Sequence, residues 1–471
     1  MSAGTEETRA LPVNEEEIQD GSQASDSSKL KTLLTILKRT VGVKDLASLR
    51  LSLPAHLLEP MPNLEYWNYQ DRADFFVSIG DYEDPLDRML ATVRYSVTKE
   101  LKFVYGRVCK PYNSILGEHF RCHWDVAPLT VNAQGEHRPS EALNTQQPLA
   151  LKLPGQGAAP SSGRRRVIYL TEQVSHHPPI SSYYYDCPEA GLSMVGVDQV
   201  SAKFTGTAVR IYPGEFNQGM FITLGPNVRA QNAVGEEYRI THPAGAIFGL
   251  FRGSFWPAVT DTATITCTPP RGSQTYLRAI IEYKEESWLS KPKYAVEGCI
   301  YTYEPGQPSA SYSALKEVPS KNVVVQLQGT WRGVITWKRK GEKTAHPLVN
   351  LADLQPCPRD VRPIDAQDAW ESRRIWKDVT DAIVGQQYSR ATQLKQQVEQ
   401  RQRELAAERK KTGAEFVPQF FERDVASGRP RLTNAGRAAV EEERRRPAGA
   451  AGAARPAPAR DEDNFEDAPS F

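Results

Sequence analysis

The runs Arg166-Val-Ile-Tyr-Leu-Thr171 and Ser181-Ser-Tyr-Tyr-Tyr185 decide the fold class of this chain. Both are rich in β-branched and aromatic residues, and the prolines between them end the first run, so they predict two neighbouring strands. Further runs of this kind extend to about Trp337, at residues 203–212, 263–267, 276–283, 294–301 and 322–327. No long helical pattern separates them, so we expect a large, nearly closed antiparallel β-barrel.

A barrel of more than eight strands is too wide for its own side chains to fill. We therefore expect a lumen that holds a ligand. Residues 132–164 interrupt the strand pattern with Ala, Gln, Gly, Pro and Ser, which is typical of a disordered surface insertion.

Three helical patterns accompany the strands. Residues 30–41 repeat leucines at helical spacing beside several lysines, residues 84–104 form a second such pattern, and a charged stretch at 365–411 ends at Thr412-Gly413. The first helix has two interpretations: it packs on its own core, or it touches anionic membranes or closes over a cavity. The overall class is mainly β with α additions.

The composition excludes several classes of protein. The chain has 471 residues with 58 basic and 57 acidic side chains, a net charge of +1, which argues against a general nucleic-acid binder. No window approaches the ~18–20 apolar residues of a membrane span. The acidic start is neither a signal nor a transit peptide. Six scattered cysteines without a CxxC pair predict reduced thiols in a cytoplasmic protein.

The composition also predicts domain limits. Residues 1–27 and 426–471 are polar or low in complexity, and we expect both tails to be disordered. Residues 28–425 form the folded domain between them.

Motifs for catalysis are missing from the sequence. It contains no GxSxG, HExxH or GxxxxGK[ST] pattern, so we expect no enzyme, no catalytic residue and no cofactor. His119 and His123 lie in a strand-like run, where residues four apart are about 13 Å apart. We therefore expect no metal site there.

The segment Glu172-Gln-Val-Ser-His-His-Pro-Pro179 contains two adjacent histidines. Neighbours on a strand point to opposite faces, so the pair does not easily share a metal. Two interpretations remain: a rigid strand end with solvated imidazoles, or two donors for an anion.

Three motifs carry a resemblance to a known family. EQVSHHPP at 172–179 is the fingerprint of the oxysterol-binding protein family, and Lys110-Pro-Tyr-Asn-Ser-Ile-Leu-Gly-Glu118 is similar to its KPxNPxLGE element, with Ser114 in place of the second proline. Lys395, Glu399 and Arg403 match its K-x3-E-x3-R pattern, with spacings of four that place them on one helix face. The resemblance covers about residues 28–425, as a short member without extra targeting domains.

The resemblance implies a lipid-transfer domain with a hydrophobic tunnel. Residues 28–50 would form a helical lid, 51–340 the helices and barrel, and 341–425 a C-terminal helical subdomain. The tunnel would take a sterol or phosphatidylserine in exchange for phosphatidylinositol 4-phosphate. The protein would touch anionic membranes peripherally and bind no nucleic acid.

The resemblance also assigns site residues. The residues of the phosphoinositide headgroup site would be Lys110, Asn113, Glu118, His176, His177, Lys395, Glu399 and Arg403. The two histidines would bind the 4-phosphate, the two lysines and the arginine would add charge, Asn113 would hydrogen-bond the headgroup, and the two glutamates would hold basic side chains or inositol hydroxyls. Leu46 and Leu49 of the lid would face the lipid.

The acidic C-terminal tail resembles a short motif that docks lipid-transfer proteins on endoplasmic-reticulum membrane anchors. Phe465 and Ala468 match its two key positions, and a plain solvated tail is the alternative. Docking would place the protein at endoplasmic-reticulum contact sites.

Two functions stay open: exchange of lipids between membranes, or a sensor that binds the same lipids and regulates partners. The sequence does not decide between sterol and phosphatidylserine as cargo.

Overall fold

The structure of the protein is a computed structural model. It describes residues 58–104, 110–127, 129–131, 136–138, 151–152, 163–205, 208–248, 256–285 and 293–447. The predicted lid with Leu46 and Leu49, and the tail positions Phe465 and Ala468, lie outside the described residues.

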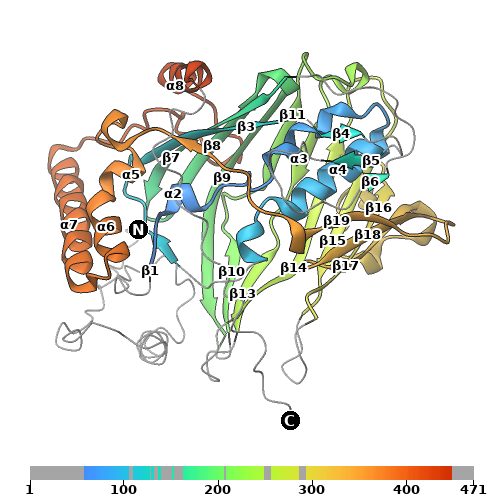
Figure 1. The fold of residues 1–471 in the computed structure, drawn as a ribbon, viewed down its shortest axis with the longest axis horizontal. Coiled ribbons are helices and arrows are strands. Elements are labelled where there is room, and N and C mark those ends of the chain that lie inside the picture. Colours follow the sequence, from blue (N-terminus) through green and yellow to red (C-terminus); the bar gives the residue numbers. More distant parts are fainter. Residues whose placement is uncertain are drawn as a thin grey trace, which may run out of the picture.

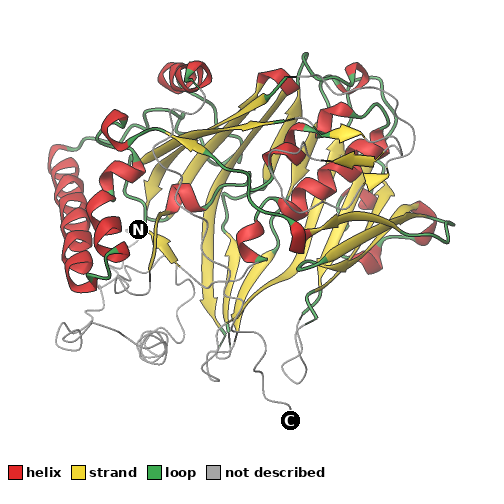
Figure 2. Ribbon diagram, in the orientation of Figure 1, coloured by secondary structure: helices red, strands yellow, loops and turns green. Residues whose placement is uncertain are grey.

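A 15-stranded sheet dominates the molecule, and all its neighbouring strands are antiparallel (Figures 1 and 2). Its strands are β3 (His119–Val126), β7 (Arg165–His176), β8 (Pro179–Cys187), β9 (Leu192–Phe204), β10 (Val209–Pro213), β11 (Met220–Leu224), β12 (Glu237–Ile240), β13 (Ala244–Phe248), β14 (Trp256–Thr268), β15 (Leu277–Tyr283), β16 (Ala295–Thr302), β17 (Val323–Thr330), β18 (Val334–Arg339), β19 (His346–Asn350) and β20 (Asp360–Val361). The path runs from β19 to β20. The predicted mainly β, antiparallel fold is confirmed.

Two long strands change partners along their length. The first half of β9 pairs with β11 and its second half with β10, while β14 pairs first with β13 and then with β12. Residues 203–212, expected as one strand, are therefore a β9–β10 hairpin whose register pairs Phe204 with Val209. The hydrophobic tunnel itself stays a prediction.

Two smaller sheets lie beside the large one. Strands β1 (Leu58–Pro62) and β2 (Lys110–Tyr112) form a parallel pair. Strands β4 (Thr130–Val131), β5 (Glu136–Arg138) and β6 (Leu151–Lys152) form the other. The prediction that residues 132–164 are disordered throughout was wrong, because β5 and β6 lie within that range.

The helices form two groups. Helices α2 (Asn63–Tyr66), α3 (Ala73–Val77) and α4 (Pro85–Thr98) lie against the sheet, and α4 starts where Asp84 accepts two backbone N–H bonds ahead of a proline. Helices α5 (Ser372–Ile375), α6 (Lys377–Val384) and α7 (Tyr388–Thr412) follow the last strand, and α6 and α7 pack together beside β1 (Figure 1).

The C-terminal end of the folded part differs from the prediction. Helix α7 ends at Gly413, whose φ of 68° is the left-handed conformation that suits glycine. Residues 426–447, however, were expected to be disordered, whereas helix α8 (Asn434–Arg445) packs on β7 and β3 (Figure 1). Within the described part of the chain, no helix has the length and apolarity needed to span a membrane.

Candidate functional site

Charged side chains from two distant parts of the sequence, β2 and α7, interact beside the sheet. Lys110 opens β2, and α7 presents Lys395, which is 4% exposed, and Glu399 one turn later. Lys395 Nζ lies 2.9 Å from Glu399 Oε1. Burial and the neighbouring Lys395 lower the pKa of Lys110 to about 8, although Glu399 opposes the shift. Among the described residues, two lysines thus lie beside one glutamate, which favours an anionic ligand.

An apolar cluster places these elements together. It joins residues of β2, α6 and α7, with Tyr112 and Trp376 at 5.0 Å between ring centroids. The Tyr112 hydroxyl lies 3.1 Å from Thr380 Oγ1, so a hydrogen bond also links β2 to α6. Packing rather than sequence proximity thus brings the two lysines together.

Glu118 organises the loop that follows Lys110. Its side chain is fully buried and accepts hydrogen bonds from the backbone N–H of Ile115 at 2.9 Å, Ser372 Oγ at 2.7 Å and Trp376 Nε1 at 3.0 Å. Ser114 Oγ, at the position where the family motif has proline, lies 3.4 Å away and donates as well. The resemblance implied that Glu118 holds basic side chains or inositol hydroxyls, but the described donors are all neutral groups of the protein. Burial raises the pKa of Glu118, and these bonds position the loop, while its part in the headgroup site stays a prediction.

The same loop is bonded to the strand that carries the two histidines. Gly117 N donates to Gln173 O at 2.9 Å, and Gln173 N donates to Glu118 O at 2.8 Å. Gly117 has a φ of +83°, and a Cβ there would come within 3.2 Å of the Phe416 ring. A glycine is required at this junction.

His176 and His177 lie at the turn between β7 and β8. Their ring centroids are 4.6 Å apart, with an angle of 60° between the planes. The rule that strand neighbours point apart did not apply, because a register shift between Gln173 and Ser175 and the turn before Pro179 end the regular strand. The two imidazoles can therefore approach one ligand.

Two further predicted site residues are on the surface. Asn113 is exposed, and so is Arg403, whose Nε donates to Gln400 Oε1 at 2.9 Å on the same helix. Lys395 and Glu399 are brought together, whereas Arg403 lies two turns along α7 from Lys395.

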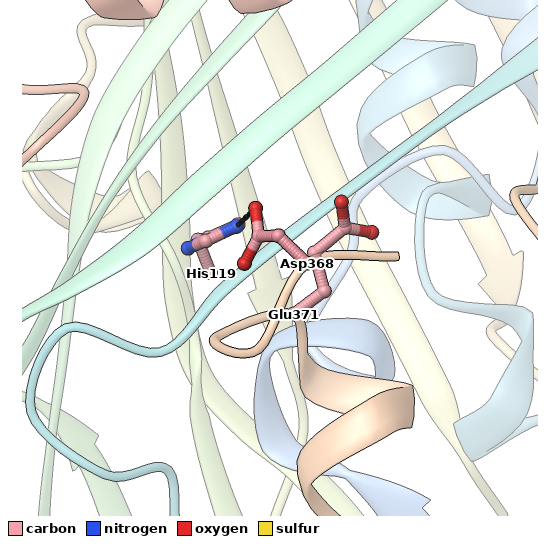
Figure 3. A group of neighbouring side chains, drawn as sticks. All are labelled: His119, Asp368 and Glu371. Carbon is pink, nitrogen blue, oxygen red and sulfur yellow. Dashed lines mark hydrogen bonds and ion pairs between the residues drawn. The ribbon is translucent and has the colours of Figure 1, made fainter. Parts of the chain in front are cut away.

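Figure 3 shows the group of described residues with metal-ligand chemistry: His119, Asp368 and Glu371. His119 Nε2 is directed at Asp368 Oδ2, 2.9 Å away. Glu371 Oε1 accepts from Arg121 Nε at 3.1 Å and Nη2 at 3.0 Å. Because a guanidinium already neutralises Glu371, these residues form an ion-pair network and not a cation site.

Sequence reasoning missed a polar group on the inner face of the sheet. Asp198 follows the core residue Met194 by four positions on β9, so both side chains lie on the same face of the strand. It accepts a hydrogen bond from Tyr69 Oη at 2.6 Å. Burial raises the pKa of Asp198 to about 7 and lowers the pKa of His242 to about 3; the His242 ring is tilted against the Tyr69 ring, with 4.9 Å between the centroids. The Tyr183 hydroxyl is buried there with no hydrogen-bond partner among the described residues. A single polar residue in an apolar alternation gave no signal in the sequence.

Comparison with known proteins identifies the family. The model of the family described as oxysterol-binding protein matches residues 32–382. Oxysterol-binding protein-like protein 1 of Schizosaccharomyces pombe is 35% identical over 484 residues, covering 88% of this chain and 91% of that protein. Oxysterol-binding protein-related protein 9 of Xenopus tropicalis is 28% identical, and the match covers 86% of this chain but only 48% of that relative.

Solved structures share the fold. The Osh1 ORD domain in complex with cholesterol superposes with a TM-score of 0.57 at 19% identity over 86% of each chain. The Osh3 ORD in complex with PI(4)P from Saccharomyces cerevisiae gives a TM-score of 0.55 at 16% identity, over 88% of this chain and 92% of that one. The chain belongs to the oxysterol-binding protein family, whose members bind or transfer lipids and are not enzymes.

Proposed function

We propose that this protein exchanges lipids between membranes, carrying a sterol or phosphatidylserine one way and phosphatidylinositol 4-phosphate the other. The observation that carries this proposal is the partly buried Lys110 beside Lys395, at the start of a strand whose following loop is bonded to β7, the strand that carries His176. Lysine and protonated histidine are strong donors to phosphate, and they act more strongly where water is partly excluded.

The inner polar group supports a second ligand. An unsatisfied buried hydroxyl such as that of Tyr183 is costly, and the polar end of a cargo lipid can satisfy it together with Asp198. Two solved domains of this fold carry cholesterol and PI(4)P, which agrees with two ligands for one architecture.

A vesicle assay tests the proposal. Donor vesicles contain a fluorescent sterol or phosphatidylserine, and acceptor vesicles contain phosphatidylinositol 4-phosphate. The wild type transfers cargo faster when the phosphoinositide is present. Stoichiometric binding without transfer above background would establish the sensor function instead.

The double variant His176→Ala with His177→Ala tests the headgroup site. It loses phosphoinositide extraction and keeps cargo binding, because the inner face does not use these imidazoles. His346→Ala, on the edge strand β19, is the control that keeps both. Loss of both ligands in the double variant would make the histidine pair structural.

We also propose that the C-terminal tail docks on an endoplasmic-reticulum membrane anchor through Phe465 and Ala468. A pull-down with the cytosolic domain of the anchor compares the wild type with Phe465→Ala. Equal recovery would contradict docking.

A further inference from the structure

Charged side chains hold helix α8 on the outer face of strands β3 and β7. The apolar part of this contact joins Ala439 and Val440 of the helix to Ile168 and Leu170 of β7, in a cluster that also contains Phe420 and Phe421. The end of the helix instead places a fully buried carboxylate, Glu443, against the sheet.

His123 of β3 lies at the centre of this contact and is fully buried. Its Nδ1 is 2.7 Å from Glu443 Oε1, and its Nε2 is 3.5 Å from Asp125 Oδ2 and 3.8 Å from Asp360 Oδ2. Both ring nitrogens thus face carboxylates, Nδ1 within hydrogen-bond distance and Nε2 within ion-pair distance but without a hydrogen bond among the described residues, and nearby negative charge favours the imidazolium. Arg446 Nη2, 3.2 Å from Nδ1, is the opposing cation, and it is itself paired with Glu443 at 2.7 Å.

Further charged groups surround the imidazole. They are the arginines Arg121, Arg166, Arg362 and Arg446 and the carboxylates Asp125, Asp360, Glu371, Glu442 and Glu443, with Asp368 beside Glu371. They come from β3, β7, β20, α8 and the segments beside them. Carboxylates outnumber arginines in this group, which favours the charged form of His123. Burial lowers the pKa of His123, but the nearby carboxylates of Asp125 and Glu443 outweigh it and raise that pKa above the ordinary 6.5.

The C-terminal segment also contacts the other end of β7. Both carboxylate oxygens of Glu172 accept backbone N–H bonds, from Gln419 at 2.7 Å and from Phe420 at 2.8 Å. Arg166, near the start of β7, donates to the backbone oxygen of Arg444 at 3.1 Å. The segment therefore runs along the strand that ends in the two histidines.

We propose that protonated His123 holds helix α8 on β3 and β7, and that loss of this proton releases the helix and loosens the turn bearing His176 and His177. The effect on the turn rests on the proposed function, whereas the release of the helix does not. A raised pKa in the docked state stabilises docking fully below the ordinary value of 6.5, and the contribution is lost as pH rises through the docked value.

Hydrogen exchange of the full chain between pH 6 and 9, corrected for intrinsic rates, tests the release. One proton is bound on docking, so protection of residues 434–446 falls by about tenfold per pH unit between the ordinary pKa of histidine and its raised pKa in the docked state. Peptides from β14 and β15 keep their protection. In His123→Gln, α8 exchanges fast at every pH, and in the control His346→Gln the wild-type slope remains.

The outcomes separate the two proposals. The proposed release of α8 is wrong if its protection in the wild type does not change with pH. It is also wrong if protection in His123→Gln changes with pH as it does in the wild type. If His123→Gln does not fold, an NMR titration of the His123 imidazole in the wild type takes its place. A titration midpoint outside the pH range in which α8 loses its protection would also overturn the proposal. Vesicles containing phosphatidylinositol 4-phosphate give the second readout. If they bind at no pH, the proposed function fails while the exchange of α8 still decides the release. If the wild type and His123→Gln bind them equally at pH 6, the coupling to the turn is wrong.

Discussion

The two ends of strand β7 carry charged groups of opposite character. Near Arg166, the charges around His123 are paired, and the pKa of Glu443 falls to about 2 because hydrogen bonds and ion pairs with His123 and Arg446 outweigh its burial. The loop after β2 is bonded to the other end of β7, and at the start of β2 burial and Lys395 lower the pKa of Lys110 to about 8. Among the described residues, the charges of the first group are paired with one another, whereas the second group has two lysines beside one glutamate.

This difference separates a structural network from a binding site. Breaking a buried, compensated network leaves a charge without its partner, which destabilises the folded protein. Removing a charge from an uncompensated site relieves the folded protein but removes a ligand contact. The same kind of substitution should therefore have opposite effects on stability at the two ends.

The largest effect is expected for Glu443→Gln. It removes the carboxylate that the buried His123 and Arg446 share and leaves them only Asp125 and Asp360, which lowers the free energy of unfolding by about 3–5 kcal/mol. Urea denaturation measures the change. Glu442→Gln, whose side chain is 59% exposed, is the matched control with a loss of at most about 1 kcal/mol. Equal losses would show that the network is not centred on Glu443.

Lys110→Met should weaken binding of the phosphoinositide headgroup by about 30-fold, or about 2 kcal/mol, because a partly desolvated charge contact is lost. The same substitution should raise the melting temperature without ligand, because burial and Lys395 disfavour the ammonium. Calorimetry measures both quantities. Lys343→Met, at an exposed position, changes neither. If Lys110→Met instead lowered the melting temperature, the Lys110 ammonium would be stabilised by an ion pair in the folded protein.

Headgroup affinity should also fall as pH rises. A pKa of about 8 means that Lys110 loses its proton in the free protein above that pH, whereas a bound phosphate retains the proton. Between pH 7 and 9 the affinity drops by about tenfold from this group alone. Titration calorimetry in two buffers of different ionisation enthalpy detects the proton uptake at pH 8. In Lys110→Met the uptake disappears, and uptake of the same size in that variant would assign it to another group.

The sequence predicted the elements whose patterns are local. The aromatic and β-branched runs around Tyr169 and Tyr183 became β7 and β8, and the spacing of Lys395 and Glu399 became one face of α7. Such patterns follow from burial of one side of a strand or helix, which the sequence records directly.

The parts that failed depend on partners far along the chain. The run Glu441-Glu-Glu-Arg-Arg-Arg446 is typical of a solvated segment, yet Glu443 is buried against His123, 320 residues away. The burial of Glu118 could not be predicted for the same reason, because its donors Ser372 and Trp376 come from the other end of the domain. A charge buried by a distant partner leaves no periodic signal in the sequence.

The smallest effect is expected where the resemblance assigns a role and the structure gives no burial. Arg403 is exposed and bonded to Gln400 of its own helix, so Arg403→Ala changes headgroup affinity by about twofold at most. Lys395→Ala, at a buried position on the same face, is the comparison and should lose far more. Vesicle binding at two salt concentrations measures both, because an exposed charge is screened and a buried one is not. If both variants lost the same affinity, helix α7 would have to turn toward the headgroup on binding. The residues of the site could then not be identified from the charges of the unliganded protein.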